Sequence, residues 1–403
     1  MSASSHAPAS CPAPGEAGSR TILLVAGEAS GDLHGAGLVA ALRQRDPRIA
    51  VWGVGGARLR AAGMHVLVDT ATVATMGFVE TFGTLARLLS MYRLLTRFMV
   101  EQHPSLLVLV DYPEFNLLLA RRAKALGIPV FYYIGPQVWA WRRARVRKIA
   151  HRVDRLGVVF PFEPGLYNNG RAAAQTTPPG SQLAEFVGHP LLDLVRPTRS
   201  REETLTRYGL DPACRVLALL PGSRKKEIRY LLPPAVAAAQ ALAREGWQPI
   251  VTVAPTLTRD DLLAALDSRW PARVRGMPIV TDDTYNIVHA ADAAVVASGT
   301  ATLETALLGR PMVIMYRVTP LTFALARLLV RVNHIGMPNI ILGREVFPEL
   351  IQRDVTANKL VAAVQRLSAR RPEVAAALGE LRGKLGQPGA ADRAANLALE
   401  LMA

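Results

Sequence analysis

The sequence predicts an α/β protein with two doubly wound domains, each built on a parallel sheet that helices cover on both faces. Short apolar runs alternate with helical patterns from Thr21 onward, and a polar stretch near residues 190–205 divides them into two series. This alternation is typical of βαβ units and therefore of parallel sheets. Half of the 403 residues are hydrophobic, which is enough for two cores, and the length favours two or three domains over one.

The first series of apolar runs predicts the sheet of an N-terminal domain over residues 21–190. Strands that are buried on both faces are apolar almost throughout, and we expect such strands at 21–26, 49–54, 105–110, 130–134 and 156–160. Helical patterns lie between the runs, for example at 38–45 and at 117–126. Residues 1–20 are rich in Ser, Ala, Pro and Gly and lack the basic start and apolar stretch of a signal peptide, so we expect a disordered tail.

The second series predicts the sheet of a C-terminal domain over residues 191–365. Its apolar runs lie at 216–220, 250–254, 278–281, 293–297 and 312–316. The Ala-, Leu- and Arg-rich segment from Val355 to Ala403 indicates helices, with breaks at Arg371-Pro372 and at Gln387-Pro388-Gly389. Residues 171–183, which contain Pro178-Pro179-Gly180, are expected to form a surface loop.

The charge and cysteine content narrow the class of protein. The net charge is +15, and residues 76–152 carry twelve Lys and Arg against four Asp and Glu, a net of +8. Such a segment suits an anionic partner, either nucleic acid or a membrane surface. Two cysteines, Cys11 and Cys214, cannot form a disulfide framework or a zinc cluster, so a reducing compartment is expected. No apolar run approaches the ~18–20 residues of a spanning helix, and we expect a cytoplasmic protein.

Two turns of the second domain have the composition of a phosphate site. The run ending at Leu220 continues as Pro221-Gly222-Ser223-Arg224, and the run ending at Ala297 continues into Ser298-Gly299-Thr300. Main-chain N–H groups at helix starts, together with an arginine, suit a phosphate. Glu304 lies one turn into the second helix, where its carboxylate could accept hydrogen bonds from a ribose. Each turn could instead be an ordinary capped βα turn, but together they favour a nucleotide-diphosphate site.

In the first domain, an acid follows the apolar run 105–110 directly. Asp111 is therefore expected at the carboxyl end of a strand, where it could accept a proton from a substrate hydroxyl. A helix N-cap or a structural ion pair is the alternative interpretation. The glycine-rich turn from Gly27 to Gly35 lacks the G-x-G-x-x-G spacing and argues against a dinucleotide. His34 could be catalytic, although a histidine at a helix start more often orients a neighbour.

A basic, apolar helix is predicted over residues 77–99. Arg87, Arg93 and Arg97 gather on one side of the helical wheel, and the remaining wide face is apolar. That face suits a core helix, an interfacial membrane helix or an acyl-chain pocket. Residues 142–152 add six basic residues after Trp139-Ala140-Trp141, a pairing found at lipid interfaces. Single-stranded nucleic acid would use similar residues, but no RNA-binding signature accompanies them, so no nucleic-acid partner is expected.

Six motifs in one order resemble the lipid A disaccharide synthase family, and the resemblance extends from about Thr21 to Ala403. The motifs are 26–32, 111–116, 136–142, 220–224, 297–304 and 338–345. The resemblance implies a GT-B fold, in which two Rossmann-like domains face a central cleft. It also implies an inverting transfer of diacylglucosamine from UDP-2,3-diacylglucosamine to 2,3-diacylglucosamine 1-phosphate (lipid X). The products would be UDP and a β-1,6-linked disaccharide 1-phosphate.

The resemblance also implies roles for individual residues. Asp111 matches the family's general base, and the UDP-sugar site matches Gly222, Ser223, Arg224, Ser298, Gly299, Thr300, Thr302, Glu304 and Asn339. We assign the acceptor side of the cleft to Glu28, Ser30, Asp32, His34, Asn116, Gln137, Trp139 and Arg142. Helices of residues 366–403 are expected to pack back on the N-terminal domain, with a homodimer as the expected assembly. Gly135, where the family often has Ser, and the insertion at 171–183 are departures from the pattern.

The expected reaction needs neither a metal nor another cofactor. No D-x-D carboxylate pair occurs in the chain, so a metal holding the diphosphate has no obvious ligands. Arg87, Arg93 and Arg97 are expected to face the anionic inner membrane on its cytoplasmic side. A UDP-N-acetylglucosamine 2-epimerase would share the architecture but would not need the basic helix at 82–99. A non-catalytic basic lipid-binding protein would explain the charge but not the paired turns.

Overall fold

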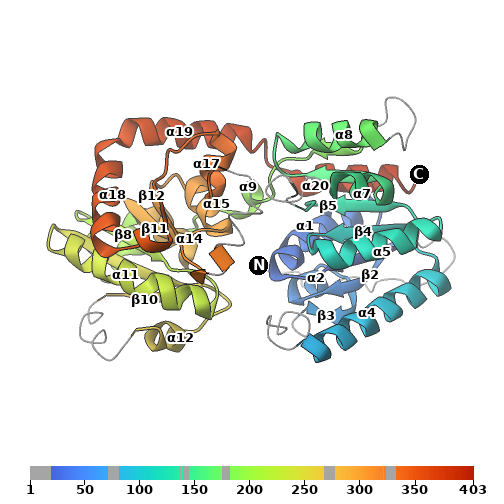
Figure 1. Cartoon of the computed structure of the whole chain (residues 1–403), viewed down its shortest axis with the longest axis horizontal. Coiled ribbons are helices and arrows are strands. Elements are labelled where there is room, and N and C mark those ends of the chain that lie inside the picture. The colour runs from blue at the N-terminus through green and yellow to red at the C-terminus, as the bar shows by residue number, and fades with distance from the viewer. Residues whose placement is uncertain are drawn as a thin grey trace, which may run out of the picture. The chain divides into compact units, whose positions relative to one another are not determined.

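The computed structural model describes residues 20–70, 81–136, 138, 145–174, 182–266, 277–320, 322–323 and 333–403. The chain divides into two compact units, of which unit 1 is Met1–Pro190 with Gly386–Ala403 and unit 2 is Leu191–Leu385. Each unit contains one parallel sheet with helices on both faces (Figure 1). The α/β prediction with two doubly wound sheets is therefore confirmed.

The sheet of unit 1 is entirely parallel, with its first strand near the middle. Its order is β3 (His65–Asp69), β2 (Ile49–Gly55), β1 (Arg20–Ala26), β4 (Leu106–Val110), β5 (Val130–Tyr133), β6 (Arg155–Val158) and β7 (Ala184–Phe186). The sequence did not predict β3, because this strand is only half-buried and has no continuous apolar run. It also did not predict β7, which has three residues and lies at the edge of the sheet.

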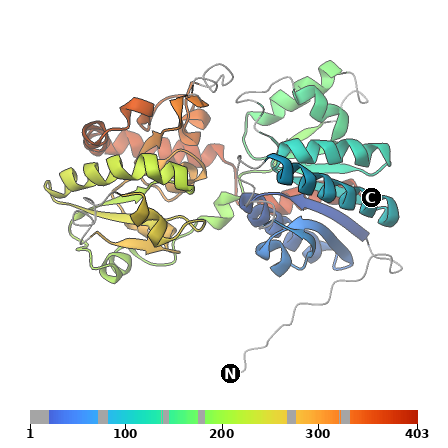
Figure 2. The same ribbon diagram turned by 60° about the horizontal axis from the view of Figure 1, so that its bottom comes forward.

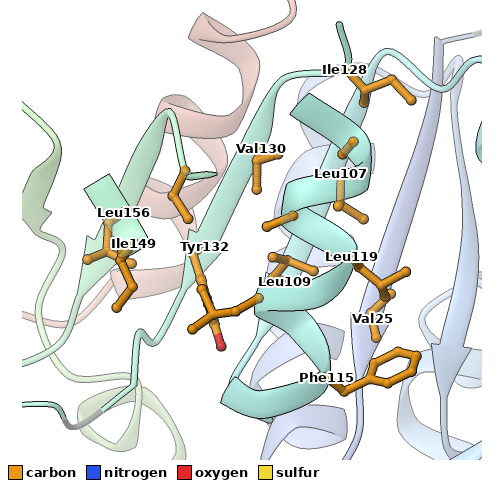
Figure 3. Close-up of a cluster of buried hydrophobic side chains, with 14 of the residues drawn as sticks. Val25, Leu107, Leu109, Phe115, Leu119, Ile128, Val130, Tyr132, Ile149 and Leu156 are labelled. Carbon is orange, nitrogen blue, oxygen red and sulfur yellow. The ribbon is translucent and has the colours of Figure 1, made fainter. Parts of the chain in front are cut away.

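Helices cover both faces of this sheet and divide the core of unit 1 into two clusters. Alternate residues of each strand point to opposite faces, so Tyr132 lies in one cluster and its neighbour Tyr133 in the other. The first cluster, part of which Figure 3 shows, lies under α4 (Thr81–Gln102), α5 (Pro113–Ala125), α7 (Arg145–Arg152) and α8 (Glu163–Ala174). The second lies under α1 (Ala29–Arg45), α2 (Ala57–Ala61) and α20 (Ala390–Glu400).

The wide apolar face of α4 is turned toward this core. Leu95 and Met99 are fully buried, and Leu88 and Tyr92 pack beside them. This observation agrees with the core-helix interpretation of that face. The opposite face is exposed and carries all three predicted arginines together with Leu89, Leu94 and Val100. Among the helices of the described residues, none is both long enough and apolar enough to cross a membrane.

The expected surface loop at 171–183 needs a correction at its start. Helix α8 continues to Ala174, so the first four residues of that segment are helical. Residues 175–181, with the Pro-Pro-Gly sequence, lie outside the described residues. A proline- and glycine-rich centre predicts a loop but does not locate where the preceding helix ends.

The sheet of unit 2 is also parallel, with its first strand near the middle. Its order is β10 (Ile279–Thr281), β9 (Trp247–Val253), β8 (Arg215–Leu220), β11 (Ala293–Ala297), β12 (Met312–Tyr316) and β13 (Glu349–Ile351). The three-residue edge strand β13 was not predicted. The helices are α9 (Leu191–Leu194), α10 (Arg201–Arg207), α11 (Lys225–Ala243), α12 (Arg259–Ala264), α14 (Thr284–Ala290), α15 (Thr300–Leu307), α17 (Met337–Leu342), α18 (Ala357–Ala369) and α19 (Arg371–Lys384).

The expected boundary of the C-terminal helices at residue 366 also needs a correction. Helix α19 belongs to unit 2, where Arg382 donates to the Leu307 carbonyl of α15 and Lys384 donates to the Ile341 carbonyl of α17. Only α20 packs in unit 1, alongside α1 (Figure 2). The chain leaves unit 2 at Gly386, not at the earlier Arg371-Pro372 break, because the buried side of α19 packs against α15 and α17.

Ion pairs and hydrogen bonds hold α20 in unit 1. The Arg45 guanidinium contacts Asp392 at 2.8 Å, and Arg155 contacts Glu400 at 2.7 Å. Arg393 donates to the Val187 carbonyl at 2.8 Å. Between these contacts, the small apolar side chains of α20 lie in the second core cluster. The chain thus returns to its first domain through one short helix.

Candidate functional site

The sheet topology identifies one candidate position in each unit. In unit 1 the chain turns from β1 toward β2 on one side and later places β4 on the other side. In unit 2 it does the same with β8 and β11. Ligands of open α/β sheets bind outside the carboxyl ends of the strands at such switch points. The turns after β1 and β4, and those after β8 and β11, are therefore the places to examine.

In unit 2, the turn after β8 already holds a carboxylate. The Ser223 main-chain N–H donates to Glu227 Oε2 at 2.9 Å, and the Arg224 guanidinium donates to Glu227 Oε1 at 3.2 Å. Gly222 has a φ of +124°, and a Cβ there would lie 2.7 Å from the Glu227 side chain, so the turn requires glycine. The Arg224 side chain is 79% exposed. The turn thus binds an anionic group and presents a cation to solvent.

The turn after β11 lies beside it, since Val296 and Leu220 are paired in the register of the sheet. Gly299 and Thr300 are exposed at the start of α15. The hydroxyls of the other two predicted residues, Ser298 and Thr302, donate to main-chain carbonyls of the protein. Thr302 is fully buried and donates to the Gly299 carbonyl at 2.7 Å, and Ser298 donates to the Ile335 carbonyl at 3.2 Å. Gly299 and Thr300, more than the hydroxyls of Ser298 and Thr302, are therefore what a ligand can reach at this turn.

Glu304 lies one turn into α15, and a tyrosine orients it. The Tyr285 hydroxyl, from α14, donates to Glu304 Oε1 at 2.9 Å. Burial raises the pKa of the Glu304 carboxyl above its ordinary value, and the hydrogen bond from Tyr285 partly offsets this effect. The hydrogen bond from Tyr285 therefore fixes one oxygen of the carboxylate and with it the orientation of the side chain, as the binding of a diol requires.

The sequence assigned Asn339 to the UDP site, but in the structure its side chain is hydrogen-bonded to other residues of unit 2. Its side-chain amide donates to the Phe347 carbonyl and to Glu349 Oε1, each at 2.8 Å. Its side-chain oxygen accepts from the N–H groups of Val346 and Phe347 at 3.0 and 3.1 Å. Since all four interactions are internal and the residue is fully buried, Asn339 holds the segment between α17 and β13.

In unit 1, the turn after β4 has an unusual backbone. Asp111 and Tyr112 both have left-handed φ values, 49° and 51°. Each such residue costs about 1–3 kcal/mol and persists only where its surroundings enforce it, most often at functional sites. Burial, and to a smaller extent the Glu28 carboxylate, raises the pKa of Asp111 to about 6. A carboxylate with this pKa is ionised at neutral pH and is a better proton acceptor than an ordinary aspartate.

The two other polar residues of this motif have different roles. Glu114 is exposed and forms an ion pair with Arg145 of α7. Asn116 is fully buried, and its side-chain amide donates to the Asp111 main-chain carbonyl at 2.7 Å. Asn116 was predicted to contact the acceptor, and the structure instead places it beneath the turn that carries Asp111.

Asp32 also has internal partners. Its carboxylate is buried and accepts from the main-chain N–H groups of Gly56, Arg58 and Leu59, at 2.6, 3.1 and 3.2 Å. These are donors at the start of the short helix α2, so Asp32 ties the turn after β1 to the turn after β2. Of the predicted residues in this first turn, Glu28 is exposed and Ser30 half-buried, so both are accessible.

The burial of His34 disfavours a role as a proton acceptor at neutral pH. Burial, with the Arg58 charge adding to it, lowers the pKa of His34 to about 4. Burial likewise lowers the pKa of His189 to about 3, and the nearby His34 contributes. Both imidazoles are therefore neutral at pH 7. Three more predicted residues of this domain, Gln137, Trp139 and Arg142, lie outside the described residues.

Sequence reasoning missed three residues that shape these turns. Glu227, three residues after Arg224, has the spacing of a helix-start acid, and that pattern could have identified it. Tyr285 and Tyr132 come from neighbouring elements, and no local sequence pattern predicts the hydrogen bonds that their hydroxyls donate to Glu304 and to the Asp111 carbonyl. Only the assembled sheet brings them to the site.

Comparisons with known proteins agree on one family. The family model described as lipid-A-disaccharide synthetase matches residues 22–394. A lipid-A-disaccharide synthase of Syntrophus aciditrophicus is 46% identical over 387 residues, covering 95% of this chain and 98% of the relative. One of Geobacter sulfurreducens is 44% identical over 390 residues, covering 95% and 98%.

Solved structures resemble the fold at much lower identity. The calicheamicin glycosyltransferase CalG4 has a TM-score of 0.61 at 16% identity, covering 95% of this chain and 98% of that one. A UDP-GlcNAc 2-epimerase from Neisseria meningitidis, solved with UDP-GlcNAc bound, has a TM-score of 0.56 at 13% identity, covering 94% and 98%. These likenesses confirm the GT-B class for the architecture.

Proposed function

The chain belongs to the lipid-A-disaccharide synthase family, whose members are glycosyltransferases of lipid A biosynthesis, and on this basis we propose its substrates. The donor is UDP-2,3-diacylglucosamine and the acceptor is lipid X, 2,3-diacylglucosamine 1-phosphate. The acceptor's 6-hydroxyl oxygen bonds to the anomeric carbon of the donor, and the bond from that carbon to UDP breaks. The products are UDP and the β-1,6-linked disaccharide 1-phosphate.

Unit 2 would bind the UDP part of the donor. The switch point between β8 and β11 carries the exposed Arg224 and the exposed main chain at Gly299 and Thr300. Helix-start N–H groups and a guanidinium stabilise a diphosphate, and they do so most strongly as it leaves with increased negative charge. Glu304 would accept from the ribose hydroxyls through the oxygen that Tyr285 does not hold. The diphosphate would compete with Glu227 for Arg224.

Unit 1 would supply the general base. Asp111 is half-buried at the other switch point, and its pKa of about 6 leaves it ionised at neutral pH yet able to take a proton. It would accept the proton of the attacking hydroxyl. This single observation, a strained acid with a raised pKa at the end of a central strand, carries the catalytic part of the proposal.

The experiment that tests this function measures UDP release in the presence and absence of lipid X. A disaccharide synthase releases UDP only when the acceptor is present, together with a stoichiometric amount of disaccharide 1-phosphate. Release without acceptor would indicate an epimerase-like or hydrolytic reaction, and no release would indicate a binding protein. Either of these two results, obtained with acylated donor in detergent micelles, would overturn the proposal.

We also propose that α4 contacts the anionic surface in which the acylated substrates lie. Its exposed face combines Arg87, Arg93 and Arg97 with Leu89 and Leu94, which are 46% and 43% exposed. Basic residues near an anionic membrane contribute about 1 kcal/mol each, and the leucines add apolar contact. This face differs from the wide apolar face that the sequence suggested, because that face packs on the core.

Vesicle sedimentation tests the membrane contact. Replacing all three arginines by Glu should release the protein from vesicles that contain phosphatidylglycerol, and high salt should have the same effect on the unchanged protein. The matched control replaces Arg244, Arg353 and Arg366, three exposed arginines of unit 2, by Glu, which changes the net charge equally. Equal release of both triple variants from the vesicles would show that binding depends only on the net charge of the protein, and it would contradict the role of α4.

A further inference from the structure

We propose that Tyr132 and Asn116 are positioning residues that hold the turn of Asp111 in its left-handed conformation and so aim its carboxylate at the acceptor. This inference rests on the proposed function, because it gives Asp111 the role of base. It assigns to Asn116 a different task from contact with the acceptor. It also gives a task to Tyr132, which lies in the sheet core and does not belong to any of the recognised motifs.

The Asp111 carbonyl lies between β4 and α5 and takes part in the main-chain hydrogen bonds of neither element. The pairing of β4 with β5 ends at Val110 and Tyr133, so the sheet provides no donor for the next carbonyl. The first main-chain bond of α5 runs from the Asn116 N–H to the Tyr112 carbonyl, one residue later. A buried carbonyl without a partner is costly, and here two side chains supply the partners.

Both side-chain donors reach the same oxygen from fully buried positions. The Tyr132 hydroxyl, from β5, donates to the Asp111 carbonyl oxygen at 2.7 Å, and the Asn116 amide, from α5, donates to it at 2.7 Å. Neither residue is exposed, and Figure 3 shows Tyr132 among the packed side chains of the first core cluster. Hydrogen bonds in such surroundings are strong, and their geometry is fixed by the packing around them.

The turn is also enclosed from the side of β1. The ring of Tyr112 lies against Gly27, where a Cβ would come within 2.4 Å of the ring carbons. A residue larger than glycine would push Tyr112 away and with it the adjacent peptide. The turn of Asp111 is therefore held by β5, α5 and the loop after β1 together. Such enforcement from several elements is what keeps a strained backbone in place.

The decisive variant is Tyr132→Phe, which removes one hydroxyl and keeps the ring. We expect kcat to fall by about 10- to 100-fold, since a misplacement of about 1 Å can cost up to 100-fold. We expect the affinity for UDP and the melting temperature to stay near those of the unchanged protein. Tyr133→Phe is the matched control, because it removes a hydroxyl from the next residue of the same strand, on the opposite face.

The pH profile of kcat/KM separates positioning from simple loss of structure. The titratable groups around Asp111 are Glu28 after β1, Tyr112 directly before α5 and Tyr132 on β5, with Arg145 of α7 acting on Tyr132. Burial is the main cause of the raised pKa of Asp111. A released turn exposes its carboxylate, so the acid limb of Tyr132→Phe should move from about pH 6 toward lower pH.

Asn116→Ala provides a second, independent variant, and it should move kcat and the acid limb in the same directions. The limb that belongs to Asp111 is the part of the acid limb that the Asp111→Asn enzyme lacks. A Tyr132→Phe enzyme with unchanged kcat, or with a lower kcat and this limb unmoved, would overturn the positioning role. A fall in kcat as large in Tyr133→Phe would also overturn it. Failure of the proposed function is a separate result, since the unchanged protein would then show no acceptor-dependent release of UDP.

Discussion

The two switch points share one architecture and differ in chemistry. In unit 1 the turn after β4 presents an acid in a strained backbone, with a second acid, Glu28, close enough to raise its pKa. In unit 2 the turns after β8 and β11 present glycines, exposed main chain and Arg224. A parallel sheet determines where functional groups emerge. The residues directly after the strands then determine whether that place accepts a proton or holds an anion.

The largest expected effect comes from removing the acid of unit 1. Asp111→Asn keeps the shape and most hydrogen bonds but cannot take a proton, so kcat should fall by about 10²–10⁴. Binding of UDP, measured by calorimetry, should be unchanged, because the residues proposed to bind UDP belong to unit 2. Glu114→Gln is the control, since Glu114 is exposed and paired with Arg145. Near-normal turnover of Asp111→Asn, or a larger loss in Glu114→Gln, would contradict the assignment.

The pH dependence should follow the raised pKa of the same carboxyl. A base must be ionised to act, so kcat/KM should decrease below about pH 6 and be about 100-fold lower at pH 4. If His34 were the base, half of the activity would remain at about pH 4, because burial lowers its pKa to that value. The acceptor phosphate also titrates near pH 6. The residual activity of Asp111→Asn should lack the limb that belongs to Asp111, which separates the two sources.

The third prediction tests the anion-binding side of the comparison. Arg224→Ala and Glu304→Ala should each weaken UDP binding by about 10- to 100-fold, the usual range for one hydrogen bond with a charged group. Calorimetry with UDP measures this, and Arg229→Ala, an exposed arginine further along α11, is the control. The melting temperature should change little in all three variants. Unchanged affinity in both test variants would remove these turns from the UDP site.

The sequence predicted the central part of this molecule better than its edges. Strands β1, β4, β8 and β11 are continuous apolar runs because both of their faces are covered, so the residues that follow them could be located directly. The edge strands β3 and β13 are only partly covered and lack that pattern. Switch points lie at the centre of a sheet, where strands are covered on both faces. The continuous apolar run that identifies such a strand therefore also locates the site residues that follow it.

The roles of polar residues near the site were harder to predict. Asp32 and Asn339 have side chains that suit a ligand, yet both are occupied by main-chain groups of distant segments. Residue type and local position do not distinguish these two uses, because the competing partners come from tertiary structure. Asp111 is different, since its place after a buried strand leaves its side chain near the end of the sheet. Its left-handed backbone, however, depends on Tyr132 and Asn116 and could not be predicted locally.

The smallest expected effect concerns the tyrosine behind Glu304. Tyr285→Phe removes the donor to Glu304 Oε1 but keeps the carboxylate that would bind the ribose, so UDP should bind only about 2- to 10-fold more weakly at pH 7.5. The bond lowers the pKa of Glu304 against the effect of burial, so its loss lets the pKa rise. More of the carboxyl is then protonated as the pH falls, and the protonated form accepts fewer hydrogen bonds from a ribose. The deficit should therefore be larger at pH 5.5, and calorimetry at both pH values measures it. Tyr230→Phe, on α11, is the control, and equal affinities of the two variants at both pH values would show that Tyr285 does not orient this carboxylate.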